Sequence, residues 1–319
     1  MISFFLFRHA IKAIYGRRFD GAPSLPYARA KDFGIEEKRF SFETDKHHIL
    51  YGSKYFKKRV KPKALVVFFH GLGDGRASYV RSICQLANEG YLVYAYDNTG
   101  CMESEGNKII SLEHTIIDQE YFFKYLEEDP NSKGLKRYSV GHSWGGYGAA
   151  MSAKPEYKIE KIVDIAGFND PLRVVSEKLP KWCHIFKPSI WLNLKCFTGK
   201  EGAQKTYQIL QNSTAKVLYI QGDKDKDVTP REGYEPLYAL FKENKRFQFL
   251  YIPNRGHSVY KSKDAEEYVQ KIMKEGITSL KSTKDVEMDL LRATNPNKEI
   301  WDKIFIFLAE TNIDKEEER

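Results

Sequence analysis

The sequence has few of the residues that mark disulfide-stabilised proteins. Its four cysteines, Cys84, Cys101, Cys183 and Cys196, are widely spaced and form no C-x-x-C pair. This pattern favours reduced, structural thiols over a disulfide framework, so we expect a cytoplasmic protein. One alternative stays open at this point: Cys183 and Cys196 could form a bridge if both lie in one small insertion.

Long apolar runs and targeting signals are also missing. No stretch reaches the roughly 18 consecutive apolar residues that a membrane-spanning helix needs. Residues 1–7 are apolar, but they lack a leading basic region and a small-residue cleavage site, so we do not expect a signal peptide.

The formal net charge of +8 is not accompanied by any nucleic-acid-binding pattern. The sequence contains no zinc-finger spacing, RNP-like aromatic motif or helix-turn-helix pattern, so nucleic acid is not an expected partner. Lysine and arginine are scattered, often beside acidic residues, which is typical of a solvated basic surface. Weak attraction to anionic lipid surfaces is the alternative.

The first eighteen residues form an amphipathic pattern with two interpretations. Five apolar side chains share one helical face, and four basic side chains surround it: Phe4, Phe7, Ile11, Ile14 and Tyr15, with Arg8, Lys12, Arg17 and Arg18. The helix could lie on a membrane surface, which would make the protein membrane-associated. It could instead pack on its own protein or on a partner. We favour packing, because such a short apolar face is common in soluble helices.

The apolar fraction of 42% in 319 residues is enough for a sizeable core. After a hairpin at 38–43 and 48–56, strand patterns alternate with helical patterns, with strands expected at 64–69, 91–96, 137–140, 161–166, 216–220 and 246–252 and helices at 78–89, 112–126 and 234–241. The continuous apolar run at 64–69 is typical of a strand buried on both faces. This order predicts an α/β protein with a mainly parallel sheet and helices on both faces.

The strand-helix order also predicts the domain organisation. Residues 1–36 form an N-terminal helix and an extended connector, while 37–168 and 216–319 form the core, which ends in helical segments. Residues 169–215 contain no strand-helix unit but many bulky apolar side chains, so we interpret them as a small helical cap. The alternative is a longer crossover that completes the core.

Residues 136–150, KRYSVGHSWGGYGAA, contain a G-x-S-x-G pattern with Ser143 at its centre. A short β-type run precedes it and a small-residue helix start follows, which is the context of a nucleophile elbow. Such a turn projects the serine hydroxyl out of the sheet, and the following helix N-terminus favours developing negative charge. Alone, the pattern would also fit a glycine-rich turn with a surface serine.

Two further strand ends carry residues that would complete the chemistry. His257 follows the last strand, and an aspartate cluster at 223–227 follows the strand before it. The histidine could act as a base, and one aspartate could orient its imidazole. The carboxyl ends of parallel strands meet in one crevice, so Ser143 and these residues are expected to converge there. The chain order is serine, aspartate, histidine.

Five ordered segments, FFHGLGDG, YDNTGCMESEG, GHSWGG, IQGDKDKDV and PNRGHS, resemble signature blocks of α/β-hydrolases. They are most similar to the monoglyceride-lipase and serine-aminopeptidase-like branch of esterases and lipases. The resemblance implies an eight-stranded-type sheet with a catalytic triad of Ser143 as nucleophile, His257 as base and Asp225 as acid. It also implies an oxyanion hole formed by the backbone N–H groups of Leu72 and Trp144, and no cofactor.

The resemblance further implies hydrolysis of a small-molecule ester through an acyl-enzyme. The aromatic and aliphatic cap favours an apolar acyl or alcohol group, with Trp182, Trp191 and His184 as candidate substrate-binding residues. A serine peptidase, a thioesterase and a catalytically silent binding protein are the alternatives, and the lack of a cap carboxylate cluster weakens the peptidase.

The remaining histidines have other expected roles. His142 is a weaker candidate base than His257, because it precedes the serine on the same strand and should point the other way. The histidines outside these motifs have no convergent partners, so no metal site is expected: His9, His47, His48 and His114.

Overall fold

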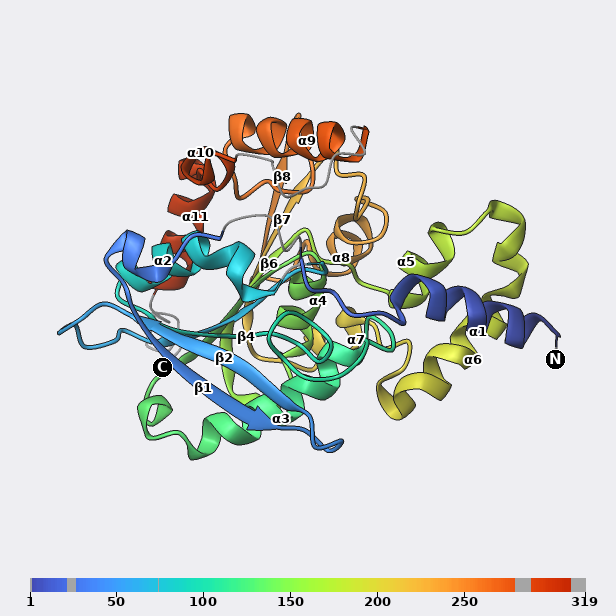
Figure 1. Ribbon diagram of the computed structural model, residues 1–319, viewed down its shortest axis with the longest axis horizontal. Coiled ribbons are helices and arrows are strands. Elements are labelled where there is room, and N and C mark those ends of the chain that lie inside the picture. Colours follow the sequence, from blue (N-terminus) through green and yellow to red (C-terminus); the bar gives the residue numbers. More distant parts are fainter. Residues whose placement is uncertain (1, 22–26, 74, 279–287, 311–319) are drawn as a thin grey trace.

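The computed structural model describes residues 2–21, 27–73, 75–278 and 288–310 (Figure 1). In these residues one sheet of eight strands has the order β1-β2-β4-β3-β5-β6-β7-β8. The strands are β1 (Glu36–Glu43), β2 (Ile49–Phe56), β3 (Leu65–Phe69), β4 (Leu92–Tyr96), β5 (Arg137–His142), β6 (Ile159–Ile165), β7 (Lys216–Gly222) and β8 (Phe247–Ile252). The hairpin β1-β2 and the pair β2-β4 are antiparallel, and all other neighbours are parallel. The predicted hairpin and mainly parallel sheet are confirmed.

Helices cover both faces of this sheet, as predicted (Figure 1). The central strand β3 shows why, since all five of its residues are buried and alternate between two cores. Val66 and Phe68 pack with α2 (Val80–Asn88) and α11 (Lys298–Ala309). Val67 and Phe69 face the other way, toward α3 (His114–Glu128), α4 (Trp144–Met151) and α8 (Tyr234–Phe241).

Two more helices, α9 (Lys263–Thr278) and α10 (Leu290–Ala293), follow β8. They contact each other at the upper left of Figure 1, above α2 and α11. Residues 279–287 and 311–319 of the expected C-terminal helical segments lie outside the described residues.

Between β6 and β7 the chain is helical, with α5 (Pro171–Glu177), η5 (Lys181–Phe186), α6 (Lys187–Thr198), η6 (Gly199–Glu201) and α7 (Thr206–Leu210). The first helix begins with Pro171, and the Asp170 side chain accepts a hydrogen bond from the Leu172 N–H at 3.0 Å. At the other end Leu210 joins the core under the sheet. The division of 169–215 from the core as a cap stays a prediction.

Helix α1 (Ile2–Tyr15) lies beside α6 at the end of the molecule that carries the N-terminus (Figure 1). Its side chains Phe7, Ile11 and Tyr15 are buried in a core shared with α5 and α6. The Asn193 Nδ2 donates a hydrogen bond to the Phe4 carbonyl at 3.0 Å. Of the two interpretations of residues 1–18, the helix packed on its own protein is therefore confirmed for this apolar face.

The connector before β1 differs from its prediction. The connector at 19–36 is not extended throughout, because residues Ala30–Phe33 form the short helix η1, and Gly34 ends it in the left-handed region with φ 69°. Residues 22–26 lie outside the described residues.

All four cysteines are free, so the bridge between Cys183 and Cys196 is not formed. None of the helices in the described part of the chain has the length and apolarity to cross a bilayer.

Candidate active site

Ser143 occupies a sharp turn between the end of β5 and the start of α4, as the motif predicted. It has φ 59° and ψ −121°, a conformation that costs energy for a residue with a side chain. The flanking glycines make the turn feasible. A Cβ at Gly141 would collide with the Gly145 carbonyl, and a Cβ at Gly145 would collide with the carbonyl oxygen of Phe69. The strained serine therefore depends on both glycines.

The loop after β3 lies against this turn. A Cβ on Gly71 would come within 3.4 Å of the His142 carbonyl oxygen. His70 holds the loop: its Nε2 accepts a hydrogen bond from the Asn98 N–H at 3.0 Å, so its Nδ1 carries the proton and donates to the Gly71 carbonyl at 2.8 Å. The His70 ring also contacts the Trp144 ring, with centroids 5.8 Å apart. Leu72 and Trp144, the predicted oxyanion pair, thus belong to two neighbouring segments.

Helix α4 begins at Trp144 beside the serine. The Ser143 side chain makes no capping hydrogen bond to this helix. The first N–H groups of a helix have no partner within the helix, and the helix dipole adds partial positive charge there. This end of α4 therefore favours negative charge next to the Ser143 hydroxyl.

Asp225 and His257 come together at the ends of the adjacent parallel strands β7 and β8. The His257 Nδ1 lies 2.8 Å from the Asp225 Oδ2. The carboxylate is buried, and three other donors fix it: Gln221 Nε2 at 2.7 Å, and the N–H groups of Asp227 and Val228 at 2.9 and 3.1 Å. A carboxylate with this many donors has a fixed orientation, and it fixes the rotation of the imidazole.

The neighbouring aspartates are placed differently. Asp223 accepts a weak hydrogen bond from the Arg255 N–H at 3.3 Å, and Asp227 is exposed. One ligand atom each of Asp225, Asp227 and His257 lie within 4.8 Å of one another, the one group of three potential metal ligands among the described residues. Both Asp225 oxygens already accept N–H hydrogen bonds, so this donor set fits a hydrogen-bonded carboxylate better than a metal ligand.

A hydrogen-bond chain that the sequence did not reveal joins these parts. His142 is buried, and its Nε2 lies 3.0 Å from the His257 carbonyl oxygen. Burial and the nearby His257 hold the pKa of His142 well below its ordinary value, so the ring is neutral. Because a carbonyl can only accept, the proton is on Nε2 and Nδ1 is an acceptor. The Tyr79 hydroxyl therefore donates to Nδ1 at 2.9 Å and accepts from the Gly71 N–H at 3.1 Å.

Two buried carboxylates near the insertion were also missed. The Glu113 Oε1 accepts a hydrogen bond from the Ala203 N–H at 2.7 Å, and burial raises the pKa of Glu113. Glu201 lies 3.6 Å from the Lys154 ammonium. Both contacts tie residues 201–203 to the core below. Neither glutamate stands in a motif, so only the folded chain reveals them.

The three candidate substrate-binding residues lie at the outer end of the insertion. Trp182 and Trp191 are 65% and 45% exposed, and the His184 Nε2 donates a hydrogen bond to the Ser176 carbonyl at 3.0 Å. Among the described residues, no hydrogen bond or ring contact joins any of the three to Ser143 or His257. Their substrate role therefore stays a prediction.

Comparisons with known proteins agree with this architecture. Residues 60–199 match a family described as serine aminopeptidase, S33. Human monoglyceride lipase is 28% identical over 100 residues, which are 31% of this chain and 33% of that protein. The match thus spans about a third of the curated relative.

Solved structures extend the likeness to most of the chain. Esterase Pf2001 of Pyrococcus furiosus has a TM-score of 0.57 at 20% identity, with 81% of this chain and 97% of that chain covered. The chain has the α/β-hydrolase fold. Acetyl xylan esterase 1 of Thermoanaerobacterium is another structural neighbour, with a TM-score of 0.53 at 16% identity and 85% and 93% of the two chains covered. By sequence, this chain resembles the monoglyceride-lipase and serine-aminopeptidase-like branch, as the motifs predicted.

Proposed function

We propose that this α/β-hydrolase is a serine hydrolase that cleaves carboxylic esters with an apolar acyl or alcohol group. The observation that carries the proposal is the 2.8 Å contact of His257 with the buried Asp225, because the His257 ring also packs on His142, the residue before the strained elbow serine. An oriented imidazole and a projecting serine hydroxyl at one edge of the sheet are the parts that acyl transfer needs.

In the proposed mechanism, His257 removes the proton of Ser143 as the hydroxyl oxygen attacks the ester carbonyl. Asp225 accepts the Nδ1–H and stabilises the imidazolium that forms. The N–H groups of Leu72 and Trp144 hold the oxyanion, an interaction worth about 3 kcal/mol per donor. His257 then protonates the leaving alcohol, and it later activates the water that hydrolyses the acyl-enzyme.

The preference for apolar substrates rests on the surroundings of the elbow. Trp144 and Tyr147 are buried in the same core as Phe168, Ile190 and Leu194, which links the elbow helix to the insertion. The elbow helix thus joins the insertion through apolar side chains, which supports a substrate with an apolar acyl or alcohol group. The names of two relatives, a monoglyceride lipase and an esterase, agree with an ester as the substrate.

A substrate panel tests the proposal. It contains p-nitrophenyl esters of increasing acyl length, an acyl thioester and an aminoacyl p-nitroanilide. We expect the esters to have the highest kcat/KM, with a maximum at apolar acyl groups. A preference for the thioester or the anilide would replace the ester assignment with thioesterase or peptidase activity. No turnover of any member would favour the catalytically silent binding protein.

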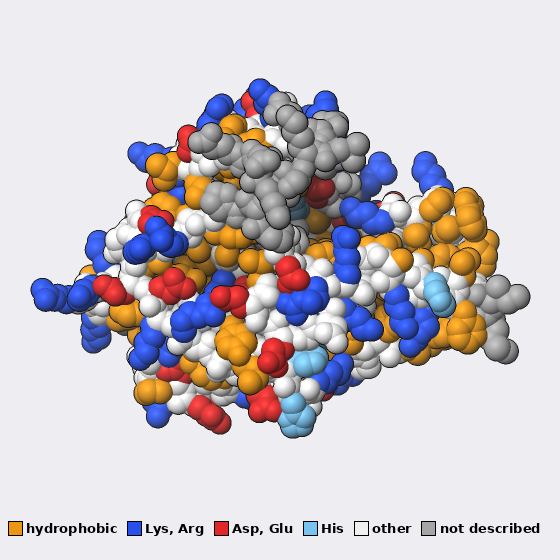
Figure 2. Space-filling model, viewed as in Figure 1, with side chains coloured by type: hydrophobic (Ala, Val, Ile, Leu, Met, Phe, Trp, Pro, Cys, Tyr) orange, Lys and Arg blue, Asp and Glu red, His pale blue; other side chains and the backbone are white. Residues whose placement is uncertain are grey.

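We also propose that the protein contacts membrane surfaces through an apolar tip formed by α1, η5 and α6. Six large hydrophobic side chains are exposed there: Phe5, Leu6, Trp182, Ile185, Trp191 and Leu192. Figure 2 shows hydrophobic side chains gathered at this end, with lysine and arginine beside them. Such a cluster with basic neighbours fits the boundary of an anionic bilayer.

Vesicle co-sedimentation of the full chain tests whether the apolar tip contacts membranes. Ile185→Asp places a charge on its most exposed member, and Ile306→Asp is the matched control, because Ile306 is similarly exposed on α11. We expect Ile185→Asp to lower binding to phosphatidylglycerol vesicles at least about fivefold and Ile306→Asp to leave it unchanged. Equal binding of both variants would remove the tip as the contact.

A further inference from the structure

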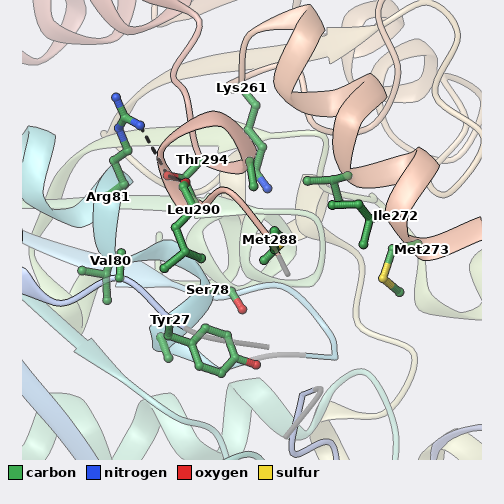
Figure 3. Close-up of a pocket in the computed structure, with 14 residues that line it drawn as sticks. Tyr27, Ser78, Val80, Arg81, Lys261, Ile272, Met273, Met288, Leu290 and Thr294 are labelled. Carbon is green, nitrogen blue, oxygen red and sulfur yellow. Dashed lines mark hydrogen bonds between the residues drawn. The ribbon is translucent and has the colours of Figure 1, made fainter. Parts of the chain in front are cut away.

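A cavity separate from the proposed ester site lies between α2, α9 and α10 (Figure 3). Its volume is about 220 Å³, and none of Ser143, Asp225 and His257 lines it. One wall comes from η2 (Arg76–Tyr79), which follows the predicted oxyanion loop, and another from Lys261. The cavity is therefore formed by segments that follow the active-site loops.

The walls of the cavity are mostly apolar. Figure 3 shows Val80 and Leu290 on one side and Ile272, Met273 and Met288 on the other. Methionine side chains are flexible and polarizable, so they adapt to a chain-like apolar ligand. A dry engineered cavity of about 150 Å³ holds benzene, and drug-sized ligands need about 300 Å³ or more. The space thus fits a single short acyl chain better than a two-chain lipid.

The polar groups of the cavity select the head of such a ligand. The Lys261 ammonium points into the space from above, and Arg81 stands at its edge (Figure 3). Ser78 has a buried hydroxyl oxygen with no hydrogen-bond partner among the described residues. None of the described residues that line the cavity is acidic. A buried hydroxyl without a partner favours a ligand that supplies one, and the two cations favour an anion.

Hydrogen bonds hold the Arg81 side chain at the edge of the cavity. Its guanidinium donates to the Leu291 carbonyl at 2.6 Å, and Figure 3 shows its hydrogen bond to Thr294. Partial burial of Arg81 lowers its pKa, because burial removes part of the hydration of the charged form. An anion near this edge would offset that desolvation.

We propose that this cavity binds a medium-chain fatty acid, with the acyl chain among Val80, Ile272 and Leu290 and the carboxylate held by Lys261 and Ser78. The ligand class follows from the apolar walls, the two cations and the unpartnered hydroxyl. The site is distinct from the proposed ester site, so it would bind the carboxylate from any source and does not depend on hydrolysis.

Isothermal titration calorimetry of the full chain with decanoate, below its micellar concentration, tests the site. Lys261→Met removes the charge and keeps most of the side-chain length. Ile272→Trp fills the cavity and keeps every charge. Lys263→Met is the matched control, because Lys263 is close in sequence but does not line the cavity. We expect the first variant to weaken binding about tenfold, the second to abolish it and the control to bind as the parent chain does.

A ligand with a cationic head group tests the preference for a carboxylate. Decyltrimethylammonium should bind at least about tenfold more weakly than decanoate, because both lining charges are positive. Thermal unfolding verifies that each variant is folded, and Ile272→Trp retains the test if Lys261→Met does not fold. Equal decanoate binding by the parent chain and Ile272→Trp, or equal binding of the cationic amphiphile, would overturn the proposal.

Discussion

The Nε2 of His142 lies 3.0 Å from the backbone carbonyl oxygen of His257, and this hydrogen bond joins the serine turn to the loop of the proposed base. On the other side of the same ring, the Tyr79 hydroxyl links Nδ1 to the Gly71 N–H. One neutral imidazole therefore connects the oxyanion loop with the segment that carries His257. Its role is positioning, because its two nitrogens are engaged by Tyr79 and by a carbonyl.

Tyr79→Phe tests this connection. It removes the hydroxyl that serves both Gly71 and His142 while keeping the buried ring. Misplacement of the reacting groups should lower kcat about tenfold and leave KM nearly unchanged, since the substrate does not touch Tyr79 in the proposed mechanism. Tyr138→Phe, in the same core but away from the turn, is the matched control and should keep full activity. Equal kcat values for the two variants would show that the Tyr79 hydroxyl has no positioning role.

Asp225→Asn tests the choice among the three neighbouring aspartates. Asp225 alone among them contacts the His257 ring, so the amide should favour the wrong imidazole tautomer and lower kcat about a thousandfold or more. Asp227→Asn, two positions along and exposed, should change kcat less than about threefold. Steady-state kinetics on a p-nitrophenyl ester measure both. A larger loss in Asp227→Asn would transfer the acid role to Asp227.

Gly145→Ala tests the packing that makes the serine turn feasible. A methyl group there would collide with the Phe69 carbonyl, which is backbone and cannot turn aside. We expect a destabilisation of about 3 kcal/mol or more in urea unfolding. Gly148→Ala lies on the same helix, where the nearest atoms to a new methyl are side-chain atoms at 3.2 and 3.3 Å. It should stay within about 1 kcal/mol of the parent chain, and similar losses in both would contradict this account of the turn.

Asp164 predicts a pH dependence of stability. Burial raises the pKa of Asp164 to about 7. One of its carboxyl oxygens accepts a single hydrogen bond, from the Gly167 N–H. The unfolded chain ionises this group near pH 4, so between pH 4 and 7 the folded state binds more protons and loses stability as pH rises. Asp164→Asn removes this loss. Urea unfolding should show its stability relative to the parent chain increasing from pH 5 to 8, by up to about 3 kcal/mol. A difference that is constant with pH would show that Asp164 ionises normally.

The strand-end positions of the site could be predicted from sequence because they depend on local patterns. The G-x-S-x-G turn and the strand before it lie within a few residues of Ser143, and the parallel order of β7 and β8 places Asp225 and His257 at one edge. The contact of Tyr79 with His142 depends instead on how η2 packs across the sheet, which leaves no local pattern.

The outer parts of the molecule were harder to predict for the same reason. Helix α1 covers part of the insertion, while Trp182 and Trp191 stay exposed, and no local pattern in the sequence indicates which side chains α1 covers. Glu113 and Glu201 stand in no motif, and only the path of residues 199–204 over the core buries them.

Covalent labelling of Ser143 tests the central claim most directly. The folded chain is treated with a fluorophosphonate, and intact-mass and peptide mass spectrometry locate the adduct. We predict one adduct on Ser143, no adduct in Ser143→Ala, and labelling at least about a hundredfold slower in Asp225→Asn, because the serine then lacks an oriented base. Failure of Ser143 to react, or equal labelling of Ser143→Ala at another residue, would contradict the account.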